Sequence, residues 1–143
     1  MYDDILLPTD GSDETSAAVE HAAEVAQRFG STVHVLSVVD TRNRFESPSA
    51  GISPSVWEDM EDERAEAAID AAIDALPDDV ETVRRERAGV PTTEILEYAD
   101  ESACDLVVMA THGRTGLEHY LIGSVAEKVV RKSPVPVMTI REG

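Results

Sequence analysis

Short apolar runs alternate along the chain with longer segments in which apolar residues recur at helical spacing. A nearly unbroken apolar run is typical of a strand that is buried on both faces of a parallel sheet. The runs predicted to be such strands are residues 5–7, 32–39, 106–109 and 137–140. The predicted helices run from Ser12 or Asp13 to Phe29, from Ser55 to Leu76, from Pro91 onward, and from Ser124 to Lys132.

A further segment, residues 80–87, is half polar and is predicted to be an edge strand, because edges tolerate charge. Strands that alternate with helices predict an α/β fold, with three layers (α/β/α) around a five-stranded parallel sheet. With the half-polar third strand at the edge, the predicted strand order is 3-2-1-4-5. Ligands bind such sheets outside the carboxyl ends of the strands, where the winding reverses. That point is the crevice between Pro8-Thr9-Asp10 and the turn after Met109.

The loop after the fourth predicted strand carries Gly113 and Gly123, separated by nine residues, with Ser124 next to the second glycine. Ser124 is predicted to cap the following helix. Free backbone N–H groups at a helix start bind anions, and glycine lets a ligand approach the backbone closely. The loop is therefore interpreted as a phosphate-binding loop. The alternative, that its glycines serve turn geometry alone, stays open, since the chain contains neither G-x-x-x-x-G-K-[ST] nor G-x-G-x-x-G.

Acidic residues dominate the charge of the chain. It has 143 residues, predicted to form a single domain over 1–143, and carries 29 Asp plus Glu against 12 Lys plus Arg, a net charge of −17. This balance argues against binding to nucleic acid or to an anionic membrane. Because 42% of the residues are hydrophobic and periodically placed, disorder is rejected. The acidic excess suggests a halophilic source, since concentrated salt screens self-repulsion.

The N-terminal residues lack the pattern of a signal peptide, and no apolar stretch approaches the ~20 residues of a membrane helix. The single cysteine, Cys104, suits a reducing compartment. A cytoplasmic location is therefore expected.

Several single residues and segments carry expectations of their own. The first helix is expected to be capped by Ser12 or Asp13 and to carry Phe29 on its apolar face. His34 is expected to be a buried, hydrogen-bonded histidine, and Trp57 and Met60 to belong to the buried stripe of the second helix. Residues 41–54 are expected to form a long loop. The arginines of the third strand are expected to form a solvated face that partly neutralises acidic neighbours, in preference to a nucleic-acid patch: Arg84, Arg85 and Arg87. The last strand, between Val135 and Ile140, is apolar and lies at an edge, which predicts a homodimer formed through this segment.

The segments ILLPTDGS, SVVD and MATHGRTGLEHYLIGSVAEKVVRKSPVPVMTI resemble the universal stress protein family, and the resemblance covers nearly the full length. In ATP-binding members of that family the last segment reads G-x-x-G, nine residues, then G-[ST]. Gly113, Gly123 and Ser124 match this pattern, whereas Ala110 replaces the first glycine. The resemblance implies an adenine nucleotide alpha hydrolase-like fold and the binding of ATP or another adenine nucleotide.

The resemblance also implies roles for individual residues. Asp10 would contact the ribose or the adenine edge, in a pocket shaped by Pro8 and Thr9. The remaining implied contacts are Val38 and Met109 on the adenine, Ala110 and Gly113 along the ribose and phosphates, and Gly123, Ser124 and Val125 at the phosphates. His112 and Arg114 lie in the loop, where contact with phosphate oxygens and exposure to solvent are both open; His119 is expected at the surface. Mg²⁺ or Mn²⁺ is expected to arrive on the phosphates, because no cluster of ligands suggests a protein metal site.

Enzymatic alternatives find less support. A haloacid-dehalogenase nucleophile would fall at Pro8, which cannot attack phosphorus. A phospho-receiver domain would need an acceptor aspartate after the third strand, where the chain has Arg87-Ala88-Gly89. No positioned base, lysine clamp or arginine finger for ATP hydrolysis is evident. The favoured function is a nucleotide-binding stress-response or signalling module with slow or absent turnover. The rival is a dimeric stress protein that binds no nucleotide and acts through protein–protein contacts, which Ala110 favours.

Overall fold

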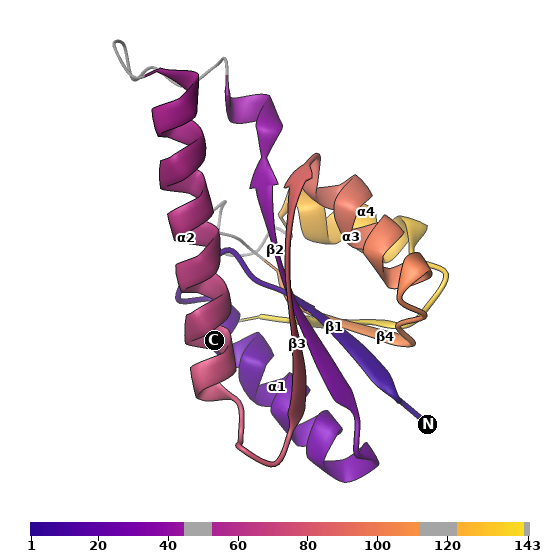
Figure 1. Cartoon of the computed structure of the whole chain (residues 1–143). Coiled ribbons are helices and arrows are strands. Elements are labelled where there is room, and N and C mark those ends of the chain that lie inside the picture. The colour runs from indigo at the N-terminus through magenta and orange to yellow at the C-terminus, as the bar shows by residue number, and fades with distance from the viewer. Residues whose placement is uncertain (45–52, 112–122, 142–143) are drawn as a thin grey trace.

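The computed structural model describes residues 1–44, 53–111 and 123–141. Five strands and four α-helices alternate along these residues, with one short 3-10 helix, η1 (Figure 1). The strands are β1 (Asp4–Pro8), β2 (Thr32–Asp40), β3 (Glu81–Gly89), β4 (Leu106–Ala110) and β5 (Val137–Ile140). The helices are α1 (Thr15–Phe29), η1 (Thr41–Arg44), α2 (Pro54–Ala75), α3 (Pro91–Glu101) and α4 (Ser124–Lys132).

The strands form one parallel sheet in the order β3-β2-β1-β4-β5, which confirms the predicted architecture and order. Helices α1 and α2 cover one face of the sheet, and α3 and α4 cover the other (Figure 1). Among the helices of the described residues, none combines the length and the apolar character that a membrane span requires.

Each face of the sheet has its own hydrophobic core, because neighbouring residues of a strand point to opposite faces. On the α1/α2 face, Ile5 and Val35 are fully buried against alanines of the two helices. On the α3/α4 face, Leu6, Leu36 and Val107 are fully buried. Burial on both faces explains why the central strands are apolar without alternation.

His34 is buried and hydrogen-bonded, as predicted. Its Nδ1 lies 2.7 Å from the hydroxyl of Tyr98 on α3, and its Nε2 lies 2.9 Å from Oδ1 of Asp4 on β1. Both ring nitrogens are therefore satisfied inside the α3/α4 core, where an unpaired polar group would be costly. This contact links β1, β2 and α3 at the amino-terminal part of the sheet.

The arginines of β3 agree with the prediction at Arg84 and Arg85, which are exposed, whereas Arg87 is partly buried. Arg84 pairs with Asp70 of α2 at 2.6 Å. Arg87 lies over the ring of Tyr98, 5.0 Å from its centroid, and pairs with Glu101 of α3. Charge pairs therefore link the edge strand to a helix on each face of the sheet.

Three helical expectations are corrected by the structure. Helix α1 begins at Thr15, and neither Ser12 nor Asp13 caps it through a side chain. Phe29 is 45% exposed and packs edge-to-face on Tyr2. Met60 is 48% exposed, because only the C-terminal half of α2 lies on the core.

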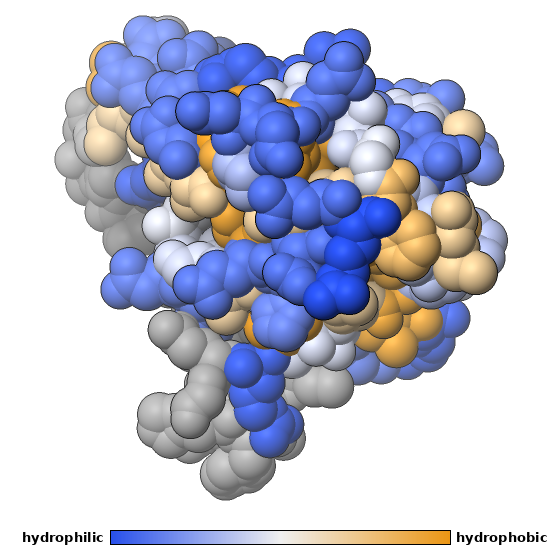
Figure 2. All heavy atoms as spheres, turned by 90° about the horizontal axis from the view of Figure 1, so that it is seen from below, coloured by the Kyte–Doolittle hydropathy of each residue, from blue (hydrophilic) through white to orange (hydrophobic). Residues whose placement is uncertain are grey.

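The segment expected to be a loop, residues 41–54, includes η1, the cap of α2 at Ser53 and the first residue of α2, Pro54; residues 45–52 lie outside the described residues. The end of the sheet with the amino ends of β2 and β3 is mostly hydrophilic, with apolar side chains gathered on one side (Figure 2). This surface agrees with the acidic composition.

Candidate functional site

Strands β1 and β4 are neighbours in the sheet, with Leu6 opposite Val107. The chain leaves β1 toward α1 on one face and leaves β4 toward α4 on the other face (Figure 1). The winding of the sheet therefore reverses between these two strands, where an open α/β sheet forms a ligand crevice. Pro8 ends β1 at this point and is followed by Thr9 and Asp10, and Ala110 ends β4 and is followed by Thr111.

The turn after β1 is held by its own hydrogen bonds. The amide of Thr9 donates to the carbonyl of Leu36 at 2.8 Å, and the amide of Gly11 donates to Oγ1 of Thr9 at 3.2 Å. Oδ1 of Asp10 accepts from the amide of Ser12 at 3.0 Å and from the hydroxyl of Thr15 at 3.3 Å. The carboxylate is thus fixed in one orientation at the carboxyl end of the sheet. The supporting roles of Ser12 and Thr15 were not predicted from the sequence.

Gly11 allows this turn by adopting a φ of +79°, and a Cβ at this position would lie 3.2 Å from Cβ of Ala68 on α2. Gly11→Ala is expected to destabilise the fold by about 1–2 kcal/mol, because a left-handed backbone is unfavourable for alanine. Urea unfolding measures the change. Combining Gly11→Ala with Ala68→Gly should recover only the steric part of the loss. Full recovery in the double variant would contradict the assigned backbone strain.

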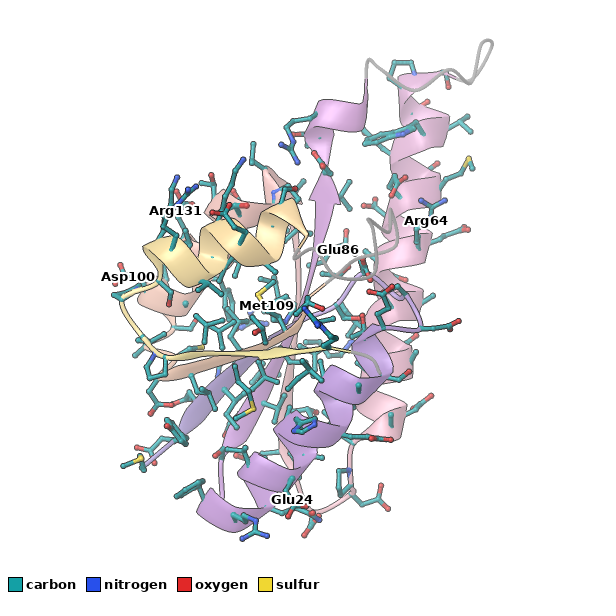
Figure 3. All side chains as sticks on the ribbon, turned by 180° about the vertical axis from the view of Figure 1, so that it is seen from behind. Glu24, Arg64, Glu86, Asp100, Met109 and Arg131 are labelled. Atoms are coloured by element: carbon teal, nitrogen blue, oxygen red, sulfur yellow. The ribbon has the colours of Figure 1, made fainter. Side chains whose placement is uncertain are left out.

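Val38 and Met109 point to the same face of the sheet, the one covered by α3 and α4. Figure 3 shows Met109 between the sheet and α4, where it is 5% exposed and packs in the same core as Ala126 and Val129. Val38 is only partly buried. Because β1 lies between the two strands, Val38 and Met109 flank the end of β1 on this face. Val38 offers more open surface to a ligand, whereas Met109 supports it from within the core.

The start of α4 differs from the prediction in one respect. Gly123 is the N-cap, with extended backbone angles of φ −60° and ψ 154°, and Ser124 is the first helical residue. The amide of Gly123 donates to the carbonyl of Thr111 at 2.7 Å, which joins the helix start to the end of β4. Within the described part of the chain, the amides of Ser124, Val125 and Ala126 have no acceptor. This terminus therefore presents three donors that no described residue satisfies, together with the positive end of the helix dipole.

Ala110 is the last residue of β4 and lies opposite Ile140 of β5, so its backbone belongs to the sheet. Gly113 and Arg114 lie outside the described residues, as do His112 and His119. The described portion of the candidate site is therefore formed by the turn after β1, the end of β4, Val38 and the start of α4.

The single cysteine of the chain, Cys104, is buried in the core. Burial, with added repulsion from Asp4 and Asp105, raises the pKa of the Cys104 thiol to about 12, so this residue stays a neutral thiol in the core. No set of three or more His, Cys, Asp or Glu residues among those described is placed to hold a metal ion.

Comparison with known proteins identifies the family that the chain resembles. The family model described as Universal stress protein family matches residues 1–141. The universal stress protein MJ0531 of Methanocaldococcus jannaschii is 36% identical over 142 residues, which cover 99% of this chain and 84% of that protein.

Solved structures agree with this match. The structure of the protein MJ0577, from the same organism, has a TM-score of 0.86 at 28% identity and covers 100% of this chain and 98% of that chain. The universal stress protein from Archaeoglobus fulgidus in complex with dAMP has a TM-score of 0.69 at 25% identity, with 97% and 98% covered. The chain belongs to the universal stress protein family.

Proposed function

We propose that this protein binds an adenine nucleotide, ATP or a related adenylate, and acts as a stress-response or signalling module. One observation carries the proposal: three backbone amides at the start of α4, without an acceptor in the described residues, lie at the switch point of the sheet. An anionic group is the ligand that such amides favour. The complex of the Archaeoglobus fulgidus relative with dAMP supports an adenylate as the anion.

Each end of the nucleotide has proposed partners. Asp10, already oriented by Ser12 and Thr15, accepts from the ribose or the adenine edge. Val38 packs on the adenine, with Pro8, Thr9 and Met109 shaping the pocket. The amides of Ser124 and its neighbours hold the phosphates, and the remaining proposed contacts are Ala110, Gly113, Arg114, Gly123 and Val125. Mg²⁺ or Mn²⁺ travels on the phosphates, because a protein of net charge −17 needs compensation for a triphosphate.

The rival function is a dimeric stress protein that acts through protein contacts alone. Mass spectrometry of small molecules released by heating the purified protein separates the two functions. An adenine nucleotide recovered in proportion to protein supports binding. A protein that releases none, and that gives no heat with ATP, ADP or AMP in calorimetry, supports the rival.

A homodimer that forms through β5 is compatible with both functions. Strand β5 has four residues, pairs only with β4 among the described strands, and leaves Val137, Met138 and Ile140 half-buried. A second copy of β5 would satisfy this open edge. Sedimentation equilibrium at micromolar concentration is expected to show a dimer, and Met138→Lys, which places a charge at the edge, is expected to shift it to monomer. A wild-type protein that stays monomeric would rule out the dimer.

The excess of 17 negative charges supports a further element of the proposal: the protein works in a salt-rich cytoplasm, as in a halophile. Among the described residues, most ion pairs are at the surface, such as Arg28 with Glu24 and Arg131 with Glu127, and surface pairs contribute little to stability. They therefore do not offset the repulsion among the remaining carboxylates.

A further inference from the structure

Thr92, in the first turn of α3, is a buried residue whose hydroxyl has no partner. Only 8% of its surface is exposed. Within the part of the chain that the structure describes, its Oγ1 forms no hydrogen bond, not even with the carbonyl of Ala88 four residues earlier, which is the usual acceptor for a helical threonine. A buried hydroxyl without a partner is costly, and it is typical of a position where a bound molecule supplies the missing hydrogen bond.

Most other buried polar side chains of the described residues do have partners. Interactions are found for Thr9, Thr15, Ser31, His34 and Thr111. Ser37 of β2 is buried and, like Thr92, forms no hydrogen bond with any described residue. By the alternation of the strand, Ser37 points to the α1/α2 face together with Val35. It therefore lies across the sheet from α3.

Helix α3 places Thr92 near the carboxyl end of β2. The helix follows β3 and leads back toward the amino end of β4, and its Tyr98 meets His34 of β2. Six residues earlier on the helix, Thr92 lies about 9 Å closer to the carboxyl ends of the strands. On β2, Leu36 and Val38 lie about 7 Å and 13 Å beyond His34 in the same direction. Thr92 is therefore level with the stretch from Leu36 to Val38.

The buried face of α3 directs Thr92 toward α4. Tyr98 marks the margin of this face that lies toward β3, because Arg87 of that strand is placed over its ring. Thr92 is about 120° around the helix from Tyr98 and occupies the opposite margin of the buried face. Helix α4 lies beside α3 on the same face of the sheet (Figure 1). The hydroxyl is therefore on the side of α3 that borders the crevice.

This position lies at one end of the proposed nucleotide site. Helices α3 and α4 both lead back from the carboxyl ends of the strands, so their first turns lie at the same edge of the sheet. The amides of Ser124 and Val125, at the start of α4, are the proposed phosphate contacts. Val38, the proposed adenine contact, is partly buried on the face that α3 and α4 cover. A nucleotide that extends from α4 to Val38 directs its base toward the first turn of α3.

We propose that the hydroxyl of Thr92 forms a hydrogen bond with the polar edge of the adenine ring and is a specificity-determining contact. This role rests on the proposed nucleotide-binding function and adds to it the group that recognises the base. A threonine hydroxyl can donate to a ring nitrogen or accept from the exocyclic amino group, whereas Val38 and Met109 offer apolar surface alone. A site built around such a hydroxyl discriminates against ligands that leave it unpaired.

Thr92→Val removes the hydroxyl and keeps the shape of the side chain. Calorimetry with AMP in concentrated KCl is expected to show an affinity about tenfold lower or more for this variant, whereas Thr92→Ser retains most of the affinity. Binding of ribose 5-phosphate, which has no base, is expected at millimolar concentration to be equal in the parent protein and in Thr92→Val. Two control variants are expected to keep the affinity for AMP. Thr93→Val makes the same change at the exposed neighbour, and Ser37→Ala removes the unpaired hydroxyl on the other face.

Thermal unfolding of the ligand-free protein gives a second readout. Because the hydroxyl of Thr92 is unpaired there, Thr92→Val is expected to raise the Tm by about 2–6 °C. Saturating AMP is expected to raise the Tm of this variant by less than it raises that of the parent protein. A threonine with a purely structural hydrogen bond would give the opposite pattern, with a lower Tm and an unchanged affinity for AMP.

The outcomes separate this role from nucleotide binding itself. Equal affinity of the parent protein and Thr92→Val for AMP, an equal loss for ribose 5-phosphate, or a lowered Tm of the ligand-free variant would each overturn the role of Thr92 while nucleotide binding stands. A parent protein that binds neither AMP nor ATP would overturn the proposed function and this role together. Circular dichroism confirms that each variant is folded.

Discussion

Gly123→Val is expected to abolish adenine-nucleotide binding while leaving the fold intact. The backbone of Gly123 is extended, with φ −60° and ψ 154°, so valine can adopt it without strain. Its branched side chain would stand at the N-cap, beside the amides of Ser124 and Val125. A hydrogen bond to a charged group contributes about 1.5–3 kcal/mol, so loss of two such bonds corresponds to a decrease in affinity of about 100-fold or more.

Calorimetry with ATP and Mg²⁺ measures this change. The matched control is Val130→Ala, because Val130 lies on the same helix with 49% of its surface exposed, remote from the helix start. Circular dichroism and thermal unfolding establish that both variants fold. A folded Gly123→Val variant with the affinity of the parent protein would refute the assigned phosphate position.

Removal of salt is expected to unfold the protein at neutral pH. The Debye length is ~10 Å at 0.1 M and ~3 Å at 1 M, so dilute buffer exposes each carboxylate to repulsion from many others. The contact of α2 with β3 is expected to be most sensitive, because Asp62, Glu66 and Glu86 meet there. Circular dichroism along a KCl series measures the transition, with sucrose as the uncharged control. Full folding in dilute buffer at pH 7 would count against adaptation to salt.

The same contact gives the salt transition a predictable dependence on pH. In the folded protein the pKa of Glu86 is raised from 4.5 to about 7, so the folded state holds this proton more firmly than the unfolded chain. The stabilisation is fully present below about pH 4.5 and is lost as the pH rises through about 7. Less KCl should therefore be needed for folding at pH 6 than at pH 8. Glu86→Gln should reduce this difference, and an unaltered difference in the variant would assign it to other carboxylates.

The strand order could be predicted because buried strands are apolar at every position and edge strands are partly polar. Residues 5–7 and 106–109 are apolar at every position, and the structure buries them on both faces. Residues 80–87 are half polar, and the structure places them at an edge. His34 could be interpreted correctly because a polar residue within a buried strand needs partners, although those partners, Asp4 and Tyr98, could not be named.

Details that depend on tertiary contacts were not predictable. Ser12 is a good N-cap residue, yet the turn at Gly11 delays the helix until Thr15. Ser124 likewise becomes the first helical residue because the amide of Gly123 bonds to Thr111 and fixes Gly123 as the cap. Met60 fits the helical period, but the N-terminal half of α2 lies off the core. Local propensity cannot report where a helix leaves the sheet.

In the candidate site, too, some features follow from the local sequence and others depend on tertiary contacts. The position of Asp10 and the amides after Gly123 could be predicted, since strand ends and helix starts follow from the fold. The hydrogen bond from Thr15 to Asp10 required the geometry of the turn. The unpaired hydroxyl of Thr92 required the packing of α3 on the sheet, which buries it level with the end of β2. Residues from separate elements meet there without a shared motif.

A crystal structure grown with adenosine monophosphate tests the central claim most directly. The account predicts the phosphate within hydrogen-bonding distance of the amides of Ser124, Val125 and Ala126, with the ribose or the adenine edge at Asp10 and the adenine on Val38. An empty crevice at saturating nucleotide, or a phosphate bound elsewhere while these amides bond to the protein itself, would contradict it.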